Sequence, residues 1–173
     1  LIRLGNYFNS EIIGLPTDQA YGVVFVNKFT ESLQDKRVDR EGIVESIAYK
    51  PNDSLPKGGN GRVPINIYIF FKKGTSETQA NNFSSFTARN ILSNTLFEYF
   101  DASGENTQVM VTPQEDDTLA ARISTFGIAR HPAQLYESIA CVFLFLFLFW
   151  LWSRQKENLP AGRLLGIFLI WCF

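Results

Sequence analysis

The stretch LYESIACVFLFLFLFWLW, from Leu135 to Trp152, decides how the rest of the chain is interpreted. It holds eighteen residues, and Glu137 is the only charged one among them. As a helix it would be about 27 Å long, close to the hydrocarbon thickness of a bilayer. A buried core helix is the alternative, but from Phe143 to Trp152 the sequence is apolar on all sides, more than a small globular domain can cover. The stretch therefore predicts a transmembrane helix.

The residues that follow this span set its predicted orientation. The short connection carries three cations against one carboxylate, namely Arg154, Lys156, Arg163 and Glu157. Short loops with an excess of positive charge stay on the cytoplasmic side of a membrane. We therefore expect residues 154–163 to form a cytoplasmic loop and residues 164–173 to begin a second, truncated membrane helix. The polar region before the first span is then expected on the outer face.

Composition excludes several classes of protein. Of 173 residues, 46% are hydrophobic and 19% are charged, so the chain has enough apolar material for a core. A formal net charge of -1 offers no field that would attract nucleic acid, and no nucleic-acid partner is expected. Two cysteines and a single histidine favour neither a disulfide framework nor a metal site built from protein ligands alone. Because the chain starts without Met and ends inside an apolar run, we expect a fragment that lacks its N- and C-terminal parts.

The polar middle, residues 31–125, predicts a water-exposed insert. PNDSLPKGGNGR at positions 51–62 is typical of an exposed turn, and the apolar alternation on either side predicts strands over 43–50 and 63–71 that pair antiparallel. Residues 75–100, which open with Ser76 and Glu77, predict a helix with one apolar face made of Phe83, Phe86, Leu92, Leu96 and Phe100. Residues 106–112 predict one more strand. The predicted fold class is an α-helical, multi-span integral membrane protein with an extracytoplasmic α+β insert.

The first segment that carries chemistry is LIRLGNYFNSEIIGLPTD, from Leu1 to Asp18. Interpreted as a helix, it places Arg3, Asn6 and Ser10 on one face. An arginine is costly in lipid and must face a cavity, an interface or a counter-ion. Its planar fork suits a phosphate, because it donates two parallel charge-assisted hydrogen bonds. The alternative is an interfacial arginine that snorkels to the headgroups.

The second segment is RHPAQLYE, residues 130–137, at the predicted outer end of the span. Pro132 suits the first turn of a helix. A carboxylate such as Glu137 within a membrane helix is by default a candidate functional group, although pairing with Arg3 or Arg130 simply to hold helices together is equally compatible with the sequence. His131 can accept a proton near neutral pH, or it can serve only as a hydrogen-bonding residue at the start of the helix.

Together these segments resemble the prolipoprotein diacylglyceryl transferase family of bacterial membrane enzymes. The resemblance rests on RLGNYFNSEIIGLPTD with the following YGVVF, on RHPAQLYES, and on GRLLGIFLI. The family signature is a series of residues at the spacing of Arg3, Gly5, Asn6, Asn9, Glu11 and Gly14. The middle of the chain is similar to the extended outer-face insert of some members.

The resemblance implies transfer of the diacylglyceryl group of phosphatidylglycerol to the lipobox cysteine of a prolipoprotein signal peptide. The products are a thioether and glycerol phosphate, and no cofactor or metal is implied. The family also implies a multi-pass protein of the bacterial cytoplasmic (inner) membrane, with its active site toward the extracytoplasmic face. Two competing interpretations are a membrane-anchored binding or scaffold protein with a partner-recruiting outer module, and a different membrane enzyme acting on phospholipid headgroups.

Site residues follow from the resemblance position by position. Arg3 is expected to hold the lipid phosphate, and the substrate-binding candidates are Arg3, Asn6, Gly14, Arg130, Gln134 and Tyr136. Supporting catalytic candidates are His131, Glu137 and Glu11. The base that activates the thiol is expected elsewhere, because the family's upstream His-Gly-Gly motif and its downstream helix with further Arg and Glu residues are not in this sequence.

The expected organisation has five parts. They are a signature segment at the outer membrane face (1–30), the extracytoplasmic insert (31–125), the RHPAQLYE motif with its transmembrane helix (126–153), the cytoplasmic loop (154–163), and the start of a further helix (164–173).

Overall fold

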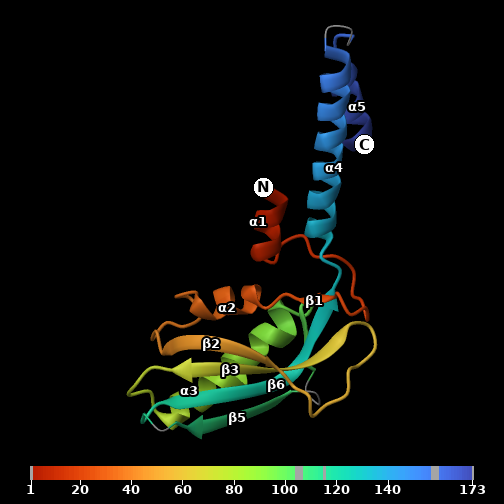
Figure 1. The fold of residues 1–173 in the computed structure, drawn as a ribbon. Coiled ribbons are helices and arrows are strands. Elements are labelled where there is room, and N and C mark those ends of the chain that lie inside the picture. The colour runs from red at the N-terminus through yellow and green to blue at the C-terminus, as the bar shows by residue number, and fades with distance from the viewer. Residues whose placement is uncertain (1, 104–106, 115, 157–159, 173) are drawn as a thin grey trace.

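The computed structural model describes residues 2–103, 107–114, 116–156 and 160–172, and for residues 2–4 and 172 only the backbone. A six-stranded antiparallel sheet forms the body of these residues, and one long helix follows the end of its central strand (Figure 1). The strands are β1 (Val23–Val24), β2 (Val44–Pro51), β3 (Arg62–Phe71), β4 (Phe100–Asp101), β5 (Gln108–Pro113) and β6 (Leu119–Arg130). The helices are α1 (Ile2–Phe8), α2 (Asn27–Gln34), α3 (Glu77–Asn82), the π-helical η1 (Phe83–Ala88) and η2 (Ile91–Thr95), α4 (Ala133–Gln155) and α5 (Arg163–Cys172).

Strand β6 is the centre of the sheet. One of its edges pairs with β3, from Arg62 opposite Ile128 to Phe70 opposite Ala120. The other edge pairs with β5 and β4, and the last two residues of β6 pair with β1. Strand β2 extends the sheet beyond β3. Because β6 ends at Arg130 and α4 begins at Ala133, the sheet leads into the long helix across only two residues.

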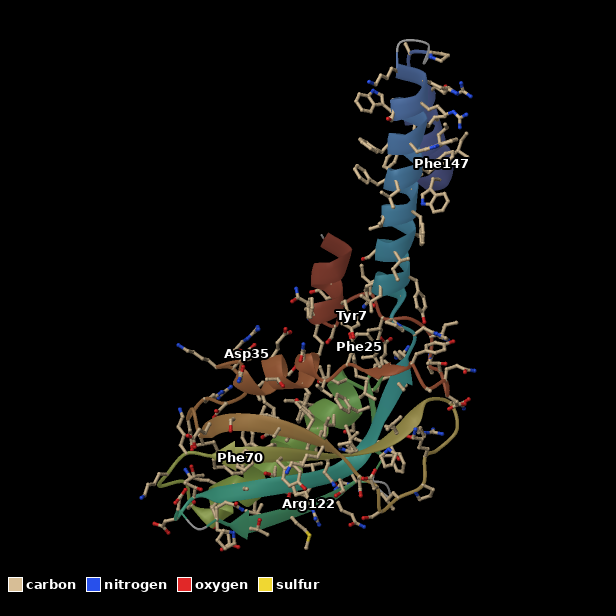
Figure 2. The ribbon with its side chains drawn as sticks, in the orientation of Figure 1. Tyr7, Phe25, Asp35, Phe70, Arg122 and Phe147 are labelled. Atoms are coloured by element: carbon tan, nitrogen blue, oxygen red, sulfur yellow. The ribbon has the colours of Figure 1, made fainter. Side chains whose placement is uncertain are left out.

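The core lies on one face of this sheet. Alternate residues of a strand point to opposite faces, and along β3 it is Ile65, Ile67, Ile69 and Phe71 that are buried. Helix α2 covers them with Phe29 and Leu33, and the α3–η2 segment adds a second buried row, made of Phe83, Ala88, Ile91, Leu92 and Leu96. Figure 2 shows Phe70 and Arg122 on the other face, which the described helices leave uncovered.

Two predictions about the insert are confirmed. Strands β2 and β3 pair antiparallel, with Lys50 opposite Asn66. Helical structure covers residues 77–95, and Ser76 opens it with a capping box to Gln79. The predicted apolar face is only partly correct, because the π-helical turns rotate the chain and leave Phe86 72% exposed.

The predicted class of a multi-span helical membrane protein is wrong. The fold is mixed α/β with a curled antiparallel sheet, and among the described residues only α4 is long and apolar enough to cross a membrane. The run that begins at Leu164, expected to begin a further helix, forms α5, whose ten described residues reach about 15 Å. At the other end, α1 ends at Phe8, before Ser10, which the helical interpretation of this segment included.

Helix α4 stands away from the sheet, with α1 beside its first half and α5 beside its far half (Figure 1). Its side chains are largely uncovered, and Phe147, labelled in Figure 2, is 47% exposed. Helix α1 is connected to the sheet body through Tyr7, whose ring lies 5.8 Å from that of Phe25, centroid to centroid. The arrangement separates an apolar helical part from a polar sheet part, and α1 lies near their boundary.

Candidate functional site

The two motif segments meet at this boundary, where β6 passes into α4. Residues 14–17 run antiparallel to residues 129–131. Thr17 N donates to Ala129 O at 2.9 Å, and His131 N donates to Leu15 O at 3.0 Å. Gly14 N closes the ladder by donating to His131 O at 3.2 Å. Segments that are far apart in the sequence, and that were identified separately, therefore form one backbone unit.

Gly14 permits this close approach. A Cβ atom built on Gly14 would lie 2.5 Å from the carbonyl oxygen of His131, a distance at which something must move. Glycine, which has no Cβ, is the residue that suits such a contact. Gly14 was predicted to bind substrate, and the structure places it in the packing between the two motifs.

Arg130 is fixed by main-chain oxygens. Its Nη1 donates to Gly14 O at 2.9 Å and its Nε donates to Glu98 O at 2.8 Å. A guanidinium has five N–H groups, and these two bonds occupy two of them. The half-buried side chain therefore holds a positive charge in a defined orientation beside both motifs. These two main-chain oxygens orient Arg130, and the ion pair with Glu137 that the sequence allowed does not.

His131 and Tyr136 form the exposed part of the site. His131 Nδ1 and Tyr136 Oη lie 3.2 Å apart, within hydrogen-bond distance, and the tautomer of the histidine decides which one donates. The ring of Tyr21 lies 5.7 Å from that of His131, centroid to centroid. Tyr136 is 46% exposed, so this group is open to ligands from outside.

Gln134 joins the second motif to Glu11. The side chain is completely buried, and its Nε2 donates to the main-chain oxygen of Glu11. Within the part of the chain that the structure describes, Gln134 Oε1 is a buried acceptor without a hydrogen-bond partner. Buried acceptors are usually paired, so this oxygen is suited to a donor group on a bound molecule. Ser138 Oγ donates to the main-chain oxygen of Gln134 at 2.8 Å and secures the first turns of α4.

The carboxylate of Glu11 points toward α2. It lies 3.6 Å from Lys28 Nζ, which also pairs with Glu31 at 3.1 Å. Burial disfavours the charged form of Lys28, but the hydrogen bond and charge of Glu31, together with Glu11, outweigh it and raise the pKa of Lys28. Lys28 was not identified from the sequence, because no motif surrounds it.

Tyr99 is a second neighbour that the sequence did not reveal. Its hydroxyl donates to the main-chain oxygen of Ser10, which is buried, at 3.0 Å. Burial raises the pKa of Tyr99, while the nearby charge of Lys28 opposes the rise. Only the fold brings Tyr99 to the signature segment.

The predicted helical face of Arg3, Asn6 and Ser10 does not extend to Ser10. Helix α1 ends at Phe8, and Ser10 and Ile12 have φ angles of 55° and 54°, so the chain leaves the helix there. The main-chain oxygen of Asn6 accepts from Glu11 N at 2.8 Å in this turn. The backbone of Arg3 lies in α1, and its side chain is outside the described residues.

The remaining candidate of the second motif is Glu137. Glu137 is half-buried on α4, one turn after Gln134. Across the described residues, no group of three or more His, Cys, Asp or Glu side chains is placed to hold a metal ion. The groups that the structure brings together at this site include a fixed guanidinium, a histidine–tyrosine pair and a buried amide oxygen.

Fold and site together define a protein whose polar site, assembled from two sequence motifs, lies at the base of an apolar helix. The sequence matches the family described as prolipoprotein diacylglyceryl transferase over residues 1–173, and the chain belongs to that family. It is therefore a transferase of lipoprotein biosynthesis, which acts on a prolipoprotein and a lipid donor. The family resemblance inferred from the motifs is confirmed. No curated protein and no solved structure gives a significant match.

Proposed function

We propose that the donor is phosphatidylglycerol and that the acceptor is the thiol of the lipobox cysteine in a prolipoprotein signal peptide. The observation that carries this proposal is the convergence of the two motif segments around the fixed guanidinium of Arg130, at the base of α4. An arginine held in this way is suited to the phosphate of a lipid headgroup. The apolar helix beside it is suited to the acyl chains.

The reaction is a substitution at carbon. The cysteine sulfur attacks the glyceryl carbon that carries the phosphate, a carbon–sulfur bond forms, and the carbon–oxygen bond to the phosphate breaks. Glycerol phosphate leaves with the electron pair, and the proton of the thiol goes to a base. Because negative charge grows on the departing phosphate, a preorganised guanidinium stabilises the transition state. Arg130, and Arg3 on α1, are the proposed phosphate ligands, while His131 with Tyr136 is the described pair suited to proton transfer.

The surroundings of the site support placing it at the extracytoplasmic surface of the bacterial cytoplasmic membrane. Helix α4 is long and apolar enough to span a bilayer. Near the start of α4, the segment that leads from α1 to β1 exposes a group of large apolar side chains, namely Phe8, Ile12, Leu15 and Tyr21. Apolar and aromatic side chains exposed at one level are typical of a membrane interface.

The donor and acceptor are tested with the full-length protein in vesicles. A prolipoprotein peptide with a lipobox cysteine is incubated with vesicles that contain phosphatidylglycerol, or phosphatidylethanolamine, or phosphatidylcholine alone, and its mass is followed. We expect a diacylglyceryl mass increase, with release of glycerol phosphate, only with phosphatidylglycerol, and none when the cysteine is replaced by serine. Equal transfer from all three lipids would refute the proposed donor. Peptide binding without transfer would favour a scaffold protein instead.

Arg3 is tested in the same assay. Losing one fixed donor to a developing charge typically costs about 2.7 to 4 kcal/mol in the barrier. We expect Arg3→Ala to lose most activity at matched expression, and Arg3→Lys to be impaired because a point charge does not reproduce the planar fork. If both variants keep near wild-type rates, Arg3 is an interfacial anchor and not a phosphate ligand.

A further inference from the structure

A closed ring of three hydrogen bonds joins the insert to the site. Thr17 N donates to Ala129 O at 2.9 Å, and Ala129 N donates to Gly61 O at 2.7 Å. Gly61 N then donates to the carboxylate of the residue after Thr17, at 2.6 Å from Asp18 Oδ1. This ring, which we call the Asp18 latch, connects the signature segment, β6 and the glycine-rich loop between β2 and β3.

The latch depends on an acceptor oxygen at position 18 and on a glycine at position 61. Gly61 N donates to Asp18 Oδ1 at 2.6 Å, and a side-chain amide oxygen at the same position is also an acceptor. Gly61 has a φ angle of +76°, in the left-handed region that favours glycine. A Cβ atom there would also lie 2.5 Å from Ala129 O. Gly61 is therefore the residue that lets the loop reach both of its partners.

The residues after Ala129 are the ones that the site uses. Arg130 and His131 follow it directly. The side chain of Arg130 donates to Gly14 O, and the backbone of His131 bonds to Gly14 and Leu15. The latch fixes Ala129 from the loop side, while Gly14 fixes His131 from the signature side. A shift of the loop would move Ala129 and, with it, the guanidinium of Arg130.

We propose that Asp18 and Gly61 are positioning residues of the transferase, which hold Arg130 and His131 in place through Ala129. This proposal gives the insert a role, because its glycine-rich loop supports the site through Ala129 without contacting substrate. Because a misplacement of about 1 Å can cost about a hundredfold in rate, loosening this ring is expected to lower kcat with little effect on KM. The inference rests on the proposed function only for its kinetic readout.

The test compares four variants of the full-length protein. We expect Asp18→Ala and Gly61→Ala to lower kcat by about ten- to a hundredfold, with the KM values for lipid and peptide within about twofold of wild type. Asp18→Asn keeps an acceptor oxygen for Gly61 N and should retain most activity. Gly59→Ala is the matched control in the same loop, because a Cβ there meets no atom within 4 Å.

A second readout does not depend on activity. Hydrogen exchange of the peptides that cover residues 58–62 and 127–132 should quicken in Asp18→Ala and Gly61→Ala, and stay unchanged in Gly59→Ala. Exchange therefore tests the latch even if the wild-type protein fails to use phosphatidylglycerol. Wild-type kcat in both variants, or Asp18→Asn as impaired as Asp18→Ala, would overturn the proposal, since the second result would assign the role to charge and not to the hydrogen bond.

Discussion

The backbone contact between Gly14 and His131 leaves no room for a side chain. We expect Gly14→Ala to push the signature segment away from α4 and to lower transfer to a model prolipoprotein by at least about tenfold. Gly166→Ala in α5 is the control, because its Cβ meets no atom within 4 Å. Lipidation is measured at matched expression in the membrane. Equal activity of both variants would mean that the contact is not needed.

Arg130 makes a second prediction at the same scale. Its Nη1 and Nε reach two different carbonyls, those of Gly14 and Glu98, and a lysine ammonium cannot occupy both positions. We expect Arg130→Lys to lower kcat about tenfold or more, whereas Arg154→Lys, at the far end of α4, should have little effect. The same peptide assay measures both. An active Arg130→Lys protein would show that positive charge suffices and that the fork is dispensable.

Sequence analysis found both motif segments but could not show that they touch. Arg130 and Gly14 are 116 positions apart, and no local periodicity reports such a contact. Tyr99 and Lys28 were missed for the same reason, since neither stands in a motif. The sequence therefore identified the motif residues with distinctive chemistry. It could not predict the main-chain hydrogen bonds between residues 14–17 and 129–131 that bring them together.

At the scale of elements, the strands differ in how clearly their sequence pattern predicts them. Strand β3 alternates large apolar residues such as Ile65, Ile67 and Ile69, and it was predicted correctly. Strand β6, LAARISTFGIAR, was assigned no element, because its core-facing side includes small residues such as Ala121 and Thr125 that weaken the alternation. Its length comes from pairing with its neighbours, which is a tertiary effect.

The contact between α2 and β2 has a pH dependence. Tyr49 Oη lies 2.7 Å from Thr30 Oγ1, and burial raises the pKa of Tyr49 from its ordinary 10.0 to about 12, although the hydrogen bond with Thr30 opposes the rise. The folded chain thus holds this proton more tightly than the unfolded chain. The resulting stabilisation is complete below pH 10 and is lost as the pH rises through about 12.

The buried hydroxyl of Tyr49 predicts a pH-dependent effect of its removal on stability. The difference in free energy of unfolding between wild type and Tyr49→Phe should shrink by up to about 3 kcal/mol as the pH rises through that window. Denaturant unfolding followed by circular dichroism measures it. Thr30→Val, which leaves Tyr49 buried and removes the hydrogen bond that opposes the rise of its pKa, should retain a pH dependence at least as large as that of wild type. A constant difference between wild type and Tyr49→Phe would contradict the assignment.

For the whole molecule, the separation of a polar sheet body from an apolar helix predicts a topology. Asp53, in the loop after β2, and Lys156, after the end of α4, are both exposed and lie at opposite ends of the structure. In a protein whose own cysteines, Cys141 and Cys172, are replaced by serine, we expect Asp53→Cys to react with an impermeant maleimide on intact spheroplasts. Lys156→Cys should react only after permeabilisation. Labelling of both positions from outside would exclude α4 as a span in this orientation.

At this largest scale the sequence was misleading about class. Hydropathy alone identified α4 correctly as a candidate span. It did not show where the first helix ends, because apolar composition does not fix helix length where the backbone turns, as it does at Ser10 and Ile12. A single curled sheet, not a helical bundle, organises the described residues.

The central position of β6 also bears on biosynthesis. Strands β1, β3, β4 and β5 all pair with β6, which is synthesised after all of them. Until Arg130 has been made, those strands lack their common partner and the sheet cannot close. Long-range pairings of this kind fold slowly, since the chain between them must be ordered first. Strands β2 and β3 can pair with each other earlier, but β1, β4 and β5 wait for the residues just before α4, so closure of the sheet coincides with synthesis of that helix.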